Sequence, residues 1–129
     1  MPHLRISDAA AFLAVSDDTI RRWIDRGELD ASTDDAGRKV VDGHQLAQLA
    51  RRRSSTAADP SGVASSARNR FVGLVTGIEK DKVMAQVELA CGDYRIVSLM
   101  SRDAADELGL EVGTPATAVV KATNVIVEV

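Results

Sequence analysis

The chain has 129 residues and a formal net charge of −3, a length that suits one domain or two small ones. Residues 1–70 carry 11 Lys and Arg against 10 Asp and Glu, and residues 71–129 carry 5 against 9, which excludes a chain that binds nucleic acid along its whole length. A single cysteine, Cys91, excludes an intramolecular disulfide and favours a reducing compartment. Because the sequence has no run of about 18 apolar residues, we expect a cytoplasmic protein that does not enter the membrane.

The first section, residues 4–53, has helical periodicity. Ser7 is expected to cap a short helix, and Ser16 a second helix over residues 17–26. A tight turn separates the two helices, and Gly27 is expected to end the second one. A short helix, a tight turn and a second helix with an apolar stripe are typical of a helix-turn-helix. The stripe consists of Ile20, Trp23 and Ile24.

A short hairpin is predicted after the second helix. Asp34-Asp35-Ala36-Gly37 is a turn signal, and the apolar pair Val40-Val41 follows it. Asp42 is then expected to cap a third helix, which ends at Arg51-Arg52-Arg53, where cations favour the helix dipole. The order of these elements is helix, turn, helix, hairpin, helix.

Residues 4–53 resemble the winged helix-turn-helix of the MerR and phage-excisionase group. The resemblance is carried by Ile6–Ala10, Val15–Trp23 and Gly27–Leu29, with Gly37–Asp42 as the wing. It implies that the second helix enters the major groove of double-stranded DNA and that the wing contacts the backbone. The residues implicated in DNA binding are Thr19, Arg21, Arg22, Arg26, Arg38 and Lys39.

Negative charge on the same helix leaves an alternative open. Asp17, Asp18 and Asp25 would repel phosphates unless they serve as dipole partners or form ion pairs with the neighbouring arginines. The alternative is a helical domain with a solvated charged face that docks on another protein.

The remainder of the chain divides into a polar stretch and a strand-rich section. Residues 54–65 are small, polar and turn-forming, which predicts a flexible linker. Residues 66–129 alternate Val and Ile with other residues between glycines, which predicts strands. Ser101 is expected to cap one short helix that ends at Gly109. The expected strands are 71–79, 82–90, 94–100, 116–121 and 124–129.

The predicted fold class is therefore α+β with two domains. Residues 1–53 form a small helical winged helix-turn-helix, residues 54–65 a linker, and residues 66–129 a five-stranded, OB-like β-barrel with one short helix.

Two donor-rich stretches bracket the second half of the chain. Ser66-Ala67-Arg68-Asn69 begins it, and Lys121-Ala122-Thr123-Asn124-Val125 lies near its end. An arginine, a lysine, small hydroxyls and backbone N–H groups, with no base and no nucleophile, favour the binding of a small oxyanion. The section is net acidic, so any anion site must rely on these local donors.

Residues 66–129 resemble the molybdenum-pterin-binding (Mop, molbindin or TOBE) family. The two stretches carry the resemblance, together with Gly73, Ser98–Ser101 and Leu108–Gly113. It implies a molybdate or tungstate site between subunits of a homo-oligomer, from a dimer up to a hexamer, in which no side chain ligates the metal directly because oxide occupies its coordination sites. The residues implicated are Ser66, Ala67, Arg68, Ser98, Leu99, Met100, Ser101, Lys121, Ala122 and Thr123.

Each of these residues also has a plain structural interpretation. Ser101 can be only a helix N-cap, Ser98 the polar face of a strand and Arg68 a surface residue. Lys121 can be an edge-strand lysine whose stem covers apolar surface.

The function predicted by combining the two halves is a molybdate- or tungstate-responsive transcriptional regulator that binds DNA. The alternative is a storage or buffering protein for the same anions, with a helical docking module. An enzyme is not predicted, because we find no paired catalytic carboxylates, no base-activated nucleophile and no phosphate-binding glycine loop.

Overall fold

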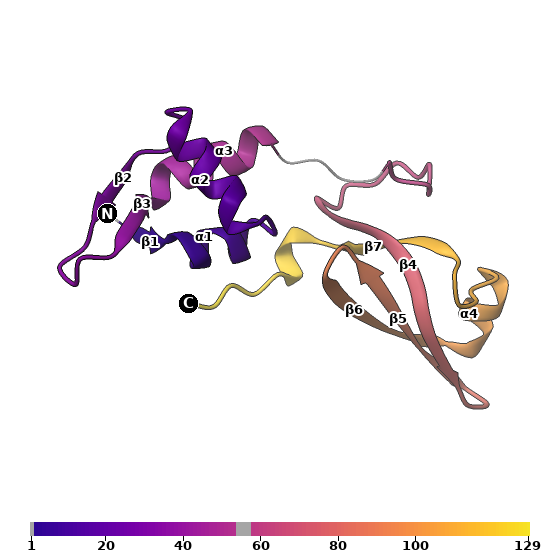
Figure 1. Cartoon of the computed structure of the whole chain (residues 1–129). Helices are drawn as coiled ribbons and strands as arrows, with labels where there is room; N and C mark the ends of the chain where they lie inside the picture. Colours follow the sequence, from indigo (N-terminus) through magenta and orange to yellow (C-terminus); the bar gives the residue numbers. More distant parts are fainter. Residues whose placement is uncertain (1, 54–57) are drawn as a thin grey trace. The chain divides into compact units, whose positions relative to one another are not determined.

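The computed structural model describes residues 2–53 and 58–129, and the chain divides into two compact units (Figure 1). The first unit is Met1–Ser55 and the second is Thr56–Val129. No helix in the described residues is long and apolar enough to cross a membrane.

The N-terminal unit combines helices with a three-stranded antiparallel sheet in the order β1-β3-β2. Its elements are β1 (His3–Arg5), α1 (Ile6–Phe12), α2 (Asp17–Asp25), β2 (Ala31–Thr33), β3 (Lys39–Asp42) and α3 (Gly43–Arg53). The core joins Ile20 and Trp23 of α2 to Val41 of β3 and to Leu46 and Leu49 of α3. The helices and the β2–β3 hairpin follow one another in the predicted order, after a strand, β1, that the sequence pattern did not predict.

Two of the predicted N-caps in this unit are confirmed. The backbone N–H of Thr19 donates to the Ser16 hydroxyl at 3.1 Å, and that of His44 donates to the Asp42 carboxylate at 2.8 Å. Gly27 follows α2 with a φ of 76°, the left-handed conformation that ends a helix at low cost for glycine. Local hydrogen-bonding signals therefore set both ends of α2 and the start of α3.

The predicted Ser7 cap is wrong. Helix α1 begins at Ile6, with Arg5 in the N-cap position and no capping hydrogen bond from its side chain. The reason is that β1 pairs with β3 up to Arg5 and runs directly into the helix, which leaves Ser7 inside the first turn. Sheet pairing therefore overrides a local capping preference at this point.

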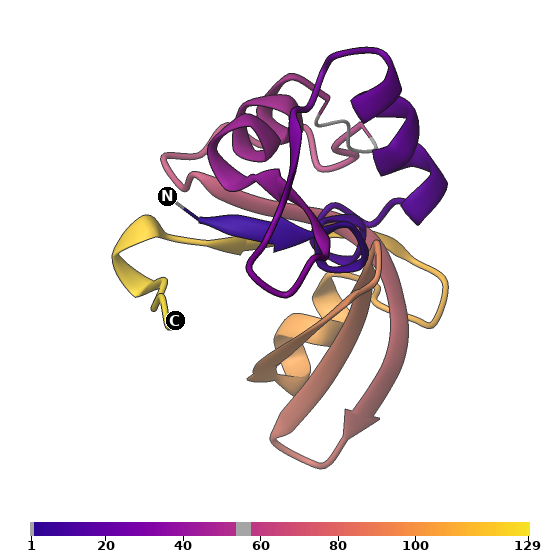
Figure 2. The same cartoon turned by 60° about the vertical axis from the view of Figure 1, so that its left-hand side comes forward.

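The C-terminal unit is a curled four-stranded antiparallel sheet in the order β6-β5-β4-β7 (Figure 2). Its elements are β4 (Asn69–Lys80), β5 (Met84–Cys91), β6 (Tyr94–Ser101), α4 (Arg102–Glu107), β7 (Pro115–Val120) and the 3₁₀ turn η1 (Ala122–Asn124). Strand β4 pairs with β7 over Asn69–Leu74 and with β5 over Leu74–Lys80. The buried core is formed by Val75, Val87, Leu89 and Cys91.

The predicted fifth strand, residues 124–129, is not present in the single chain. Strand β7 ends at Val120, η1 turns the backbone, and the last five residues have no strand pairing. Ile126 and Val127 are 85% and 84% exposed. The alternating apolar pattern is suited to a strand, but a strand needs a partner for its backbone N–H and C=O groups, and residues 125–129 pair with neither edge of this sheet. The tail leaves the sheet in both views (Figures 1 and 2).

Part of the predicted linker is attached to the C-terminal unit. Residues 54–57 lie outside the described residues. Asp59 forms an ion pair with Arg70 of β4 and accepts a hydrogen bond from the Thr117 hydroxyl of β7 at 2.7 Å. The segment that begins at Asp59 is thus held on the sheet, several residues before β4 begins.

Gly73 marks a close approach between β4 and the end of β5. A Cβ atom built on Gly73 would meet the backbone of Ala90 in a forbidden contact and would lie 2.8 Å from Cys91 Sγ. Cys91 is itself buried, and its Sγ donates to the Phe71 carbonyl at 3.5 Å. The absence of a side chain at Gly73 therefore lets the strands cross where β4 passes from β7 to β5.

We predict that Gly73→Ala destabilises the C-terminal unit by about 1–3 kcal/mol, because backbone atoms must move to admit the methyl group. Gly77→Ala is the matched control: its Cβ would meet only Glu88 Cβ, at an ordinary 3.9 Å. Urea unfolding of both variants measures the difference. Equal stability of the two variants would contradict the steric interpretation.

Candidate functional site

The first and last donor-rich stretches emerge side by side from one end of the sheet. Asn69 pairs with Val120 in the β4–β7 register, and the Asn69 side-chain amide donates to the Val120 carbonyl at 3.1 Å. The register therefore brings Ser66–Arg68 next to Lys121–Thr123, although some fifty residues separate them in sequence. Asn69 secures this juxtaposition.

The two cations of these stretches are available for a ligand. Arg68 and Lys121 are both exposed, and neither side chain has a hydrogen-bonding or ionic partner among residues 2–53 and 58–129. Ala67, next to Arg68 in sequence, is buried, and its N–H donates to the Ser65 hydroxyl at 3.1 Å. The backbone is thus fixed while the charged groups are left free.

The third predicted stretch, Ser98–Ser101, lies on β6 at the opposite edge of the sheet. Ser98 pairs with Val87 and Ser101 with Met84 in the β5–β6 register. The side chains alternate, so that Ser98 and Met100 are half-buried while Leu99 is 68% exposed. The hydrogen-bonding pattern of a single chain therefore joins two of the three stretches and leaves the third on another strand edge.

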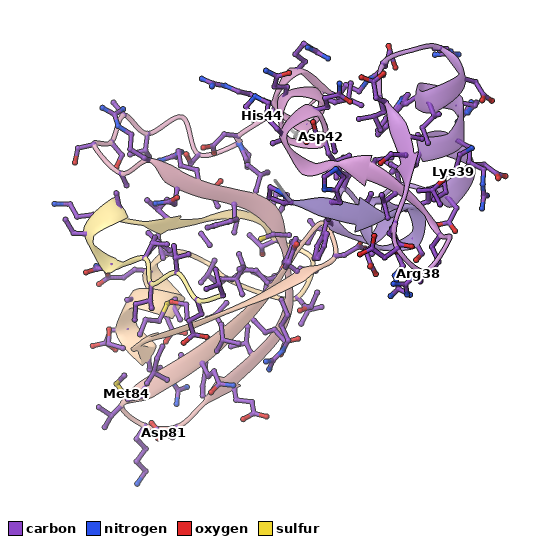
Figure 3. All side chains as sticks on the ribbon, turned by 90° about the vertical axis from the view of Figure 1, so that its left-hand side faces the viewer. Arg38, Lys39, Asp42, His44, Asp81 and Met84 are labelled. Atoms are coloured by element: carbon purple, nitrogen blue, oxygen red, sulfur yellow. The ribbon has the colours of Figure 1, made fainter. Side chains whose placement is uncertain are left out.

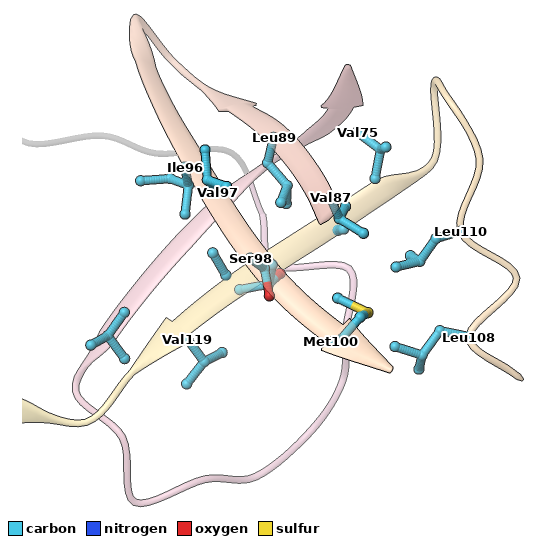
Figure 4. Close-up of a pocket in the computed structure, with 14 residues that line it drawn as sticks. Val75, Val87, Leu89, Ile96, Val97, Ser98, Met100, Leu108, Leu110 and Val119 are labelled. Atoms are coloured by element: carbon cyan, nitrogen blue, oxygen red, sulfur yellow. The ribbon is translucent and has the colours of Figure 1, made fainter. Parts of the chain in front are cut away.

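A groove of about 270 Å³ separates the two edge strands (Figure 4). Its walls come from β6, β7 and the segment after α4, and they are mostly apolar, with Ile96, Met100 and Leu110 among them. The Ser98 hydroxyl points into this groove, surrounded by apolar side chains. An apolar groove gives an oxyanion too few donors, so the groove by itself is not the anion site.

Ser101 acts as the N-cap of α4, as predicted. The backbone N–H of Ala104 donates to the Ser101 hydroxyl oxygen at 3.1 Å. A hydroxyl that accepts in this way still has its own hydrogen to donate. The structural role and the proposed anion role of Ser101 are therefore compatible.

On the N-terminal unit, acidic neighbours pair with two of the six residues predicted to bind DNA. Arg21 forms an ion pair with Asp18 at 3.3 Å, and Arg38 forms one with Asp34 at 3.0 Å. Arg21 and Asp18 are 55% and 89% exposed, so that pair contributes little to stability and can be exchanged for a phosphate contact. Asp34 is only 23% exposed, but the Arg38 side chain beside it is 57% exposed and remains accessible. The acidic residues thus reduce the net positive charge of the surface without blocking it.

The other predicted DNA-binding residues form no ion pair with an acidic residue among the described residues. Arg22 donates to the Thr19 hydroxyl at 3.1 Å, a neutral partner. The side chains of Arg26 and Lys39 have no partner among the described residues, and both residues are exposed. Arg38 and Lys39 lie on the β2–β3 hairpin (Figure 3), so the hairpin and α2 both present cations.

The hairpin tip is held by Asp34. Its carboxylate accepts from the backbone N–H of Arg38 at 2.8 Å and of Ala36 at 3.0 Å. These hydrogen bonds, the Arg38 backbone bond first, lower the pKa of Asp34 below its ordinary value. The turn that the sequence predicted is thereby fixed, and Arg38 is oriented by the same carboxylate.

Sequence reasoning missed two residues that hold the site together. Asn69 was part of the recognised motif, but its hydrogen bond to Val120 depends on the strand register. Asp59 lies within the predicted linker, but it contacts both β4 and β7. No group of three or more His, Cys, Asp or Glu side chains in the described residues is suited to hold a metal ion.

Comparison with known proteins identifies both halves. A TOBE-domain family model matches residues 65–127, and a helix-turn-helix domain model matches residues 4–54. Over 63 residues the chain is 44% identical to molybdenum-pterin-binding protein 2 of Clostridium pasteurianum, a match that covers 48% of this chain and 93% of that protein. The chain belongs to the molybdenum-pterin-binding protein family.

Two further proteins are similar to about half of the chain. The chain is 42% identical over 72 residues to the molybdenum transport protein ModE of Herbaspirillum seropedicae, which covers 55% of this chain and 27% of ModE. A solved molybdate-binding protein from Sporomusa ovata is 32% identical, with a TM-score of 0.49, over 51% of this chain and 98% of that one. In this member of the molybdenum-pterin-binding family, a helix-turn-helix domain accompanies the TOBE domain.

We predict that Ser101→Ala lowers the free energy of unfolding by about 1 kcal/mol through loss of the α4 cap. Ser101→Asp is the informative companion, since aspartate retains the cap but places a negative charge beside any bound anion. Thermal unfolding and molybdate titration of both variants separate the two roles. Stability restored and molybdate binding lost in Ser101→Asp is the expected result; full molybdate binding by Ser101→Asp would exclude Ser101 from the anion site.

Proposed function

We propose that this protein is a molybdate- or tungstate-responsive transcriptional regulator that binds double-stranded DNA through its N-terminal unit. One observation carries the proposal: the same chain contains a helix-turn-helix domain with exposed cations and a TOBE domain with two adjacent donor-rich stretches. The helix-turn-helix domain supplies contacts for phosphates and bases, and the TOBE domain supplies donors for a small dianion.

The donor set suits a tetrahedral oxyanion. Arg68 and Lys121 together balance two negative charges, and the hydroxyls and N–H groups of neighbouring residues orient the oxygens. The set contains no general base and no nucleophile, so it binds its ligand and leaves it unchanged. The complete proposed set is Ser66, Ala67, Arg68, Ser98, Leu99, Met100, Ser101, Lys121, Ala122 and Thr123.

We infer that the anion is held between subunits of a homo-oligomer. Ser66–Arg68 and Lys121–Thr123 belong to one end of a sheet, while Ser98–Ser101 lies on the far edge strand, so a second copy of the chain supplies the missing donors. An oligomer also explains the exposed tail. Residues 125–129 of one copy are suited to add a fifth strand at a free edge of another copy, where the apolar groove would bury them.

Assembly of the oligomer would couple anion binding to DNA binding. An anion that bridges two copies stabilises the assembled state by its differential affinity for that state. Two helix-turn-helix units carried by one assembly bind paired half-sites with a higher effective concentration than separate units. The anion thereby controls DNA binding without any change inside the N-terminal unit.

Storage or buffering of the anion is the second candidate function. The match to the Clostridium pasteurianum relative covers 93% of that protein but only 48% of this chain, so a molybdenum-pterin-binding protein can be about half as long as this one. Such a protein binds its ligand with no DNA contact. In that case the N-terminal unit would be a docking module, and no DNA affinity would depend on Arg22 or Lys39.

We predict that Arg68→Ala and Lys121→Ala each weaken molybdate binding at least about tenfold, because each removes a charge-assisted hydrogen bond. Calorimetric titration with molybdate, tungstate and sulfate at matched ionic strength measures the loss. Lys82→Ala, which removes an exposed lysine outside these three stretches, is the matched control. Undiminished binding of molybdate by both variants would refute the site.

We also predict that Arg22→Ala with Lys39→Ala weakens DNA binding and lowers the slope of log affinity against log salt by roughly 0.9 for each phosphate that the variant no longer neutralises. A binding sequence selected from a random duplex pool supplies the probe for mobility shifts, and Lys82→Ala again controls for charge. Molybdate binding should be unaffected in the double variant. Tight molybdate binding with no retained duplex for the wild-type protein would favour storage.

A further inference from the structure

The Asp59 carboxylate accepts hydrogen bonds from three residues, although it lies in a stretch that the sequence predicts to be a flexible linker. One carboxylate oxygen accepts from Arg70 Nε at 2.8 Å, and the other accepts from the Thr117 hydroxyl at 2.7 Å and the Ser61 N–H at 2.9 Å. Arg70 also donates through Nη2 to the Ser61 hydroxyl at 2.8 Å. The carboxylate therefore joins one strand residue on β4 and one on β7 to its own segment.

The contacts lie on the outer face of the sheet. Val72 pairs with Thr117, and Arg70 with Val119, so Arg70 and Thr117 share a face. Ala116, next to Thr117 in sequence, packs on the core and fixes that face as the outer one. The side chains of Asp59 and Arg70 are 29% and 25% exposed, so the pair is partly shielded from water although it lies at the surface.

We propose that Asp59 is an anchor that fastens the start of the C-terminal unit, ahead of β4, onto strands β4 and β7, and that it thereby limits how far the N-terminal unit can reach from that sheet. The backbone N–H of Ser61, then the hydroxyl of Thr117 and the guanidinium of Arg70, hold the pKa of the Asp59 carboxyl well below its usual range, so the anchor is charged at neutral pH.

The anchor shortens the connection substantially. Asp59 is six residues beyond Arg53, the last residue of α3, whereas Ala67, the next buried residue of the segment, is fourteen residues beyond it. A chain extends at most about 3.3–3.6 Å per residue, so the maximum reach from α3 is about 20 Å with the anchor and about 50 Å without it. The shorter reach restricts the positions that the N-terminal unit can take.

The consequence for paired DNA half-sites rests on the proposed function, whereas the anchor itself does not. Arg70 is two residues from Arg68, and Thr117 is four from Lys121. The same strand ends therefore carry the anchor's partners and the two cations of the proposed anion site. An anion that fixes these ends acts on an attached segment, and a tether of defined reach limits the half-site spacings that a pair of units can span.

The test compares Asp59→Ala and Thr117→Val with the control Asp35→Ala, whose carboxylate has no partner among the described residues. Two readouts need neither DNA nor anion, so they are independent of the proposed function. The first is amide hydrogen exchange at Ser61, measured by NMR on the full chain. The second is the distance distribution between spin labels at Gln48→Cys and Asp93→Cys, in a Cys91→Ala background.

We expect Asp59→Ala to accelerate exchange at Ser61 at least about fivefold, because its acceptor is removed. The distance distribution should widen by on the order of 10 Å as the connection lengthens from six to fourteen residues. Thr117→Val should give a smaller change in the same direction, and Asp35→Ala none. A distribution in Asp59→Ala that matches the wild type would overturn the anchor, as would equal widening in Asp35→Ala.

Discussion

The hydrogen-bonding of strand β4 is the constraint on which the C-terminal unit depends. Its first half pairs with β7 and its second half with β5, and the change of partner occurs around Leu74 and the irregularity between Val75 and Gly77. Gly73 permits the close crossing with β5 at this point. This arrangement brings the two donor-rich stretches together at one end, places Arg70 beside β7 for Asp59, and leaves β6 and β7 as edges that flank an apolar groove. The proposed anion site, the anchor and the proposed subunit contact all follow from it.

The small number of unpaired cations in the C-terminal unit explains why the proposed oxyanion site needs donors from more than one chain. Residues 71–129 are net acidic, and most of the cations there are already paired: Lys80 with Asp106, Arg95 with Glu88 and Arg102 with Asp106. At the joined strand ends, Arg68 and Lys121 have no acidic partner among the described residues and can meet a dianion. Two cations neutralise the charge of the anion, but they do not replace its hydration shell, which requires further hydroxyl and N–H donors. In the proposed oligomer, a facing subunit would bring such donors from Ser98–Ser101 and would exclude water from the same surface.

Local signals in the sequence predicted local structure well, and long-range contacts account for what they missed. The caps at Ser16, Asp42 and Ser101 and the end of α2 at Gly27 depend on neighbours within a few residues, and all four are confirmed. The role of Asp59 depends on Thr117, 58 residues away. The alternation of apolar residues in 124–129 predicts a strand. Alternation shows that a segment is suited to strand pairing, but it does not identify the strand with which the segment pairs. The donor stretches were recognisable as motifs, yet their adjacency follows only from the Asn69–Val120 register.

The modest charge of the N-terminal unit bears on how a regulator of this kind would work. Arg21 and Arg38 face acidic partners, and the phosphate contacts available to one unit are therefore few and exchangeable. Because phosphate neutralisation supplies most non-specific affinity, one unit alone would bind DNA weakly at physiological salt. If one N-terminal unit binds DNA weakly, the affinity of the whole protein for DNA depends steeply on whether two such units are held together. It also depends on the distance that the two units can span. In the proposed regulator, assembly at the C-terminal unit would determine whether two units are held together, and the Asp59 anchor would determine their reach. Control of DNA binding would then lie outside the proposed DNA-binding helix.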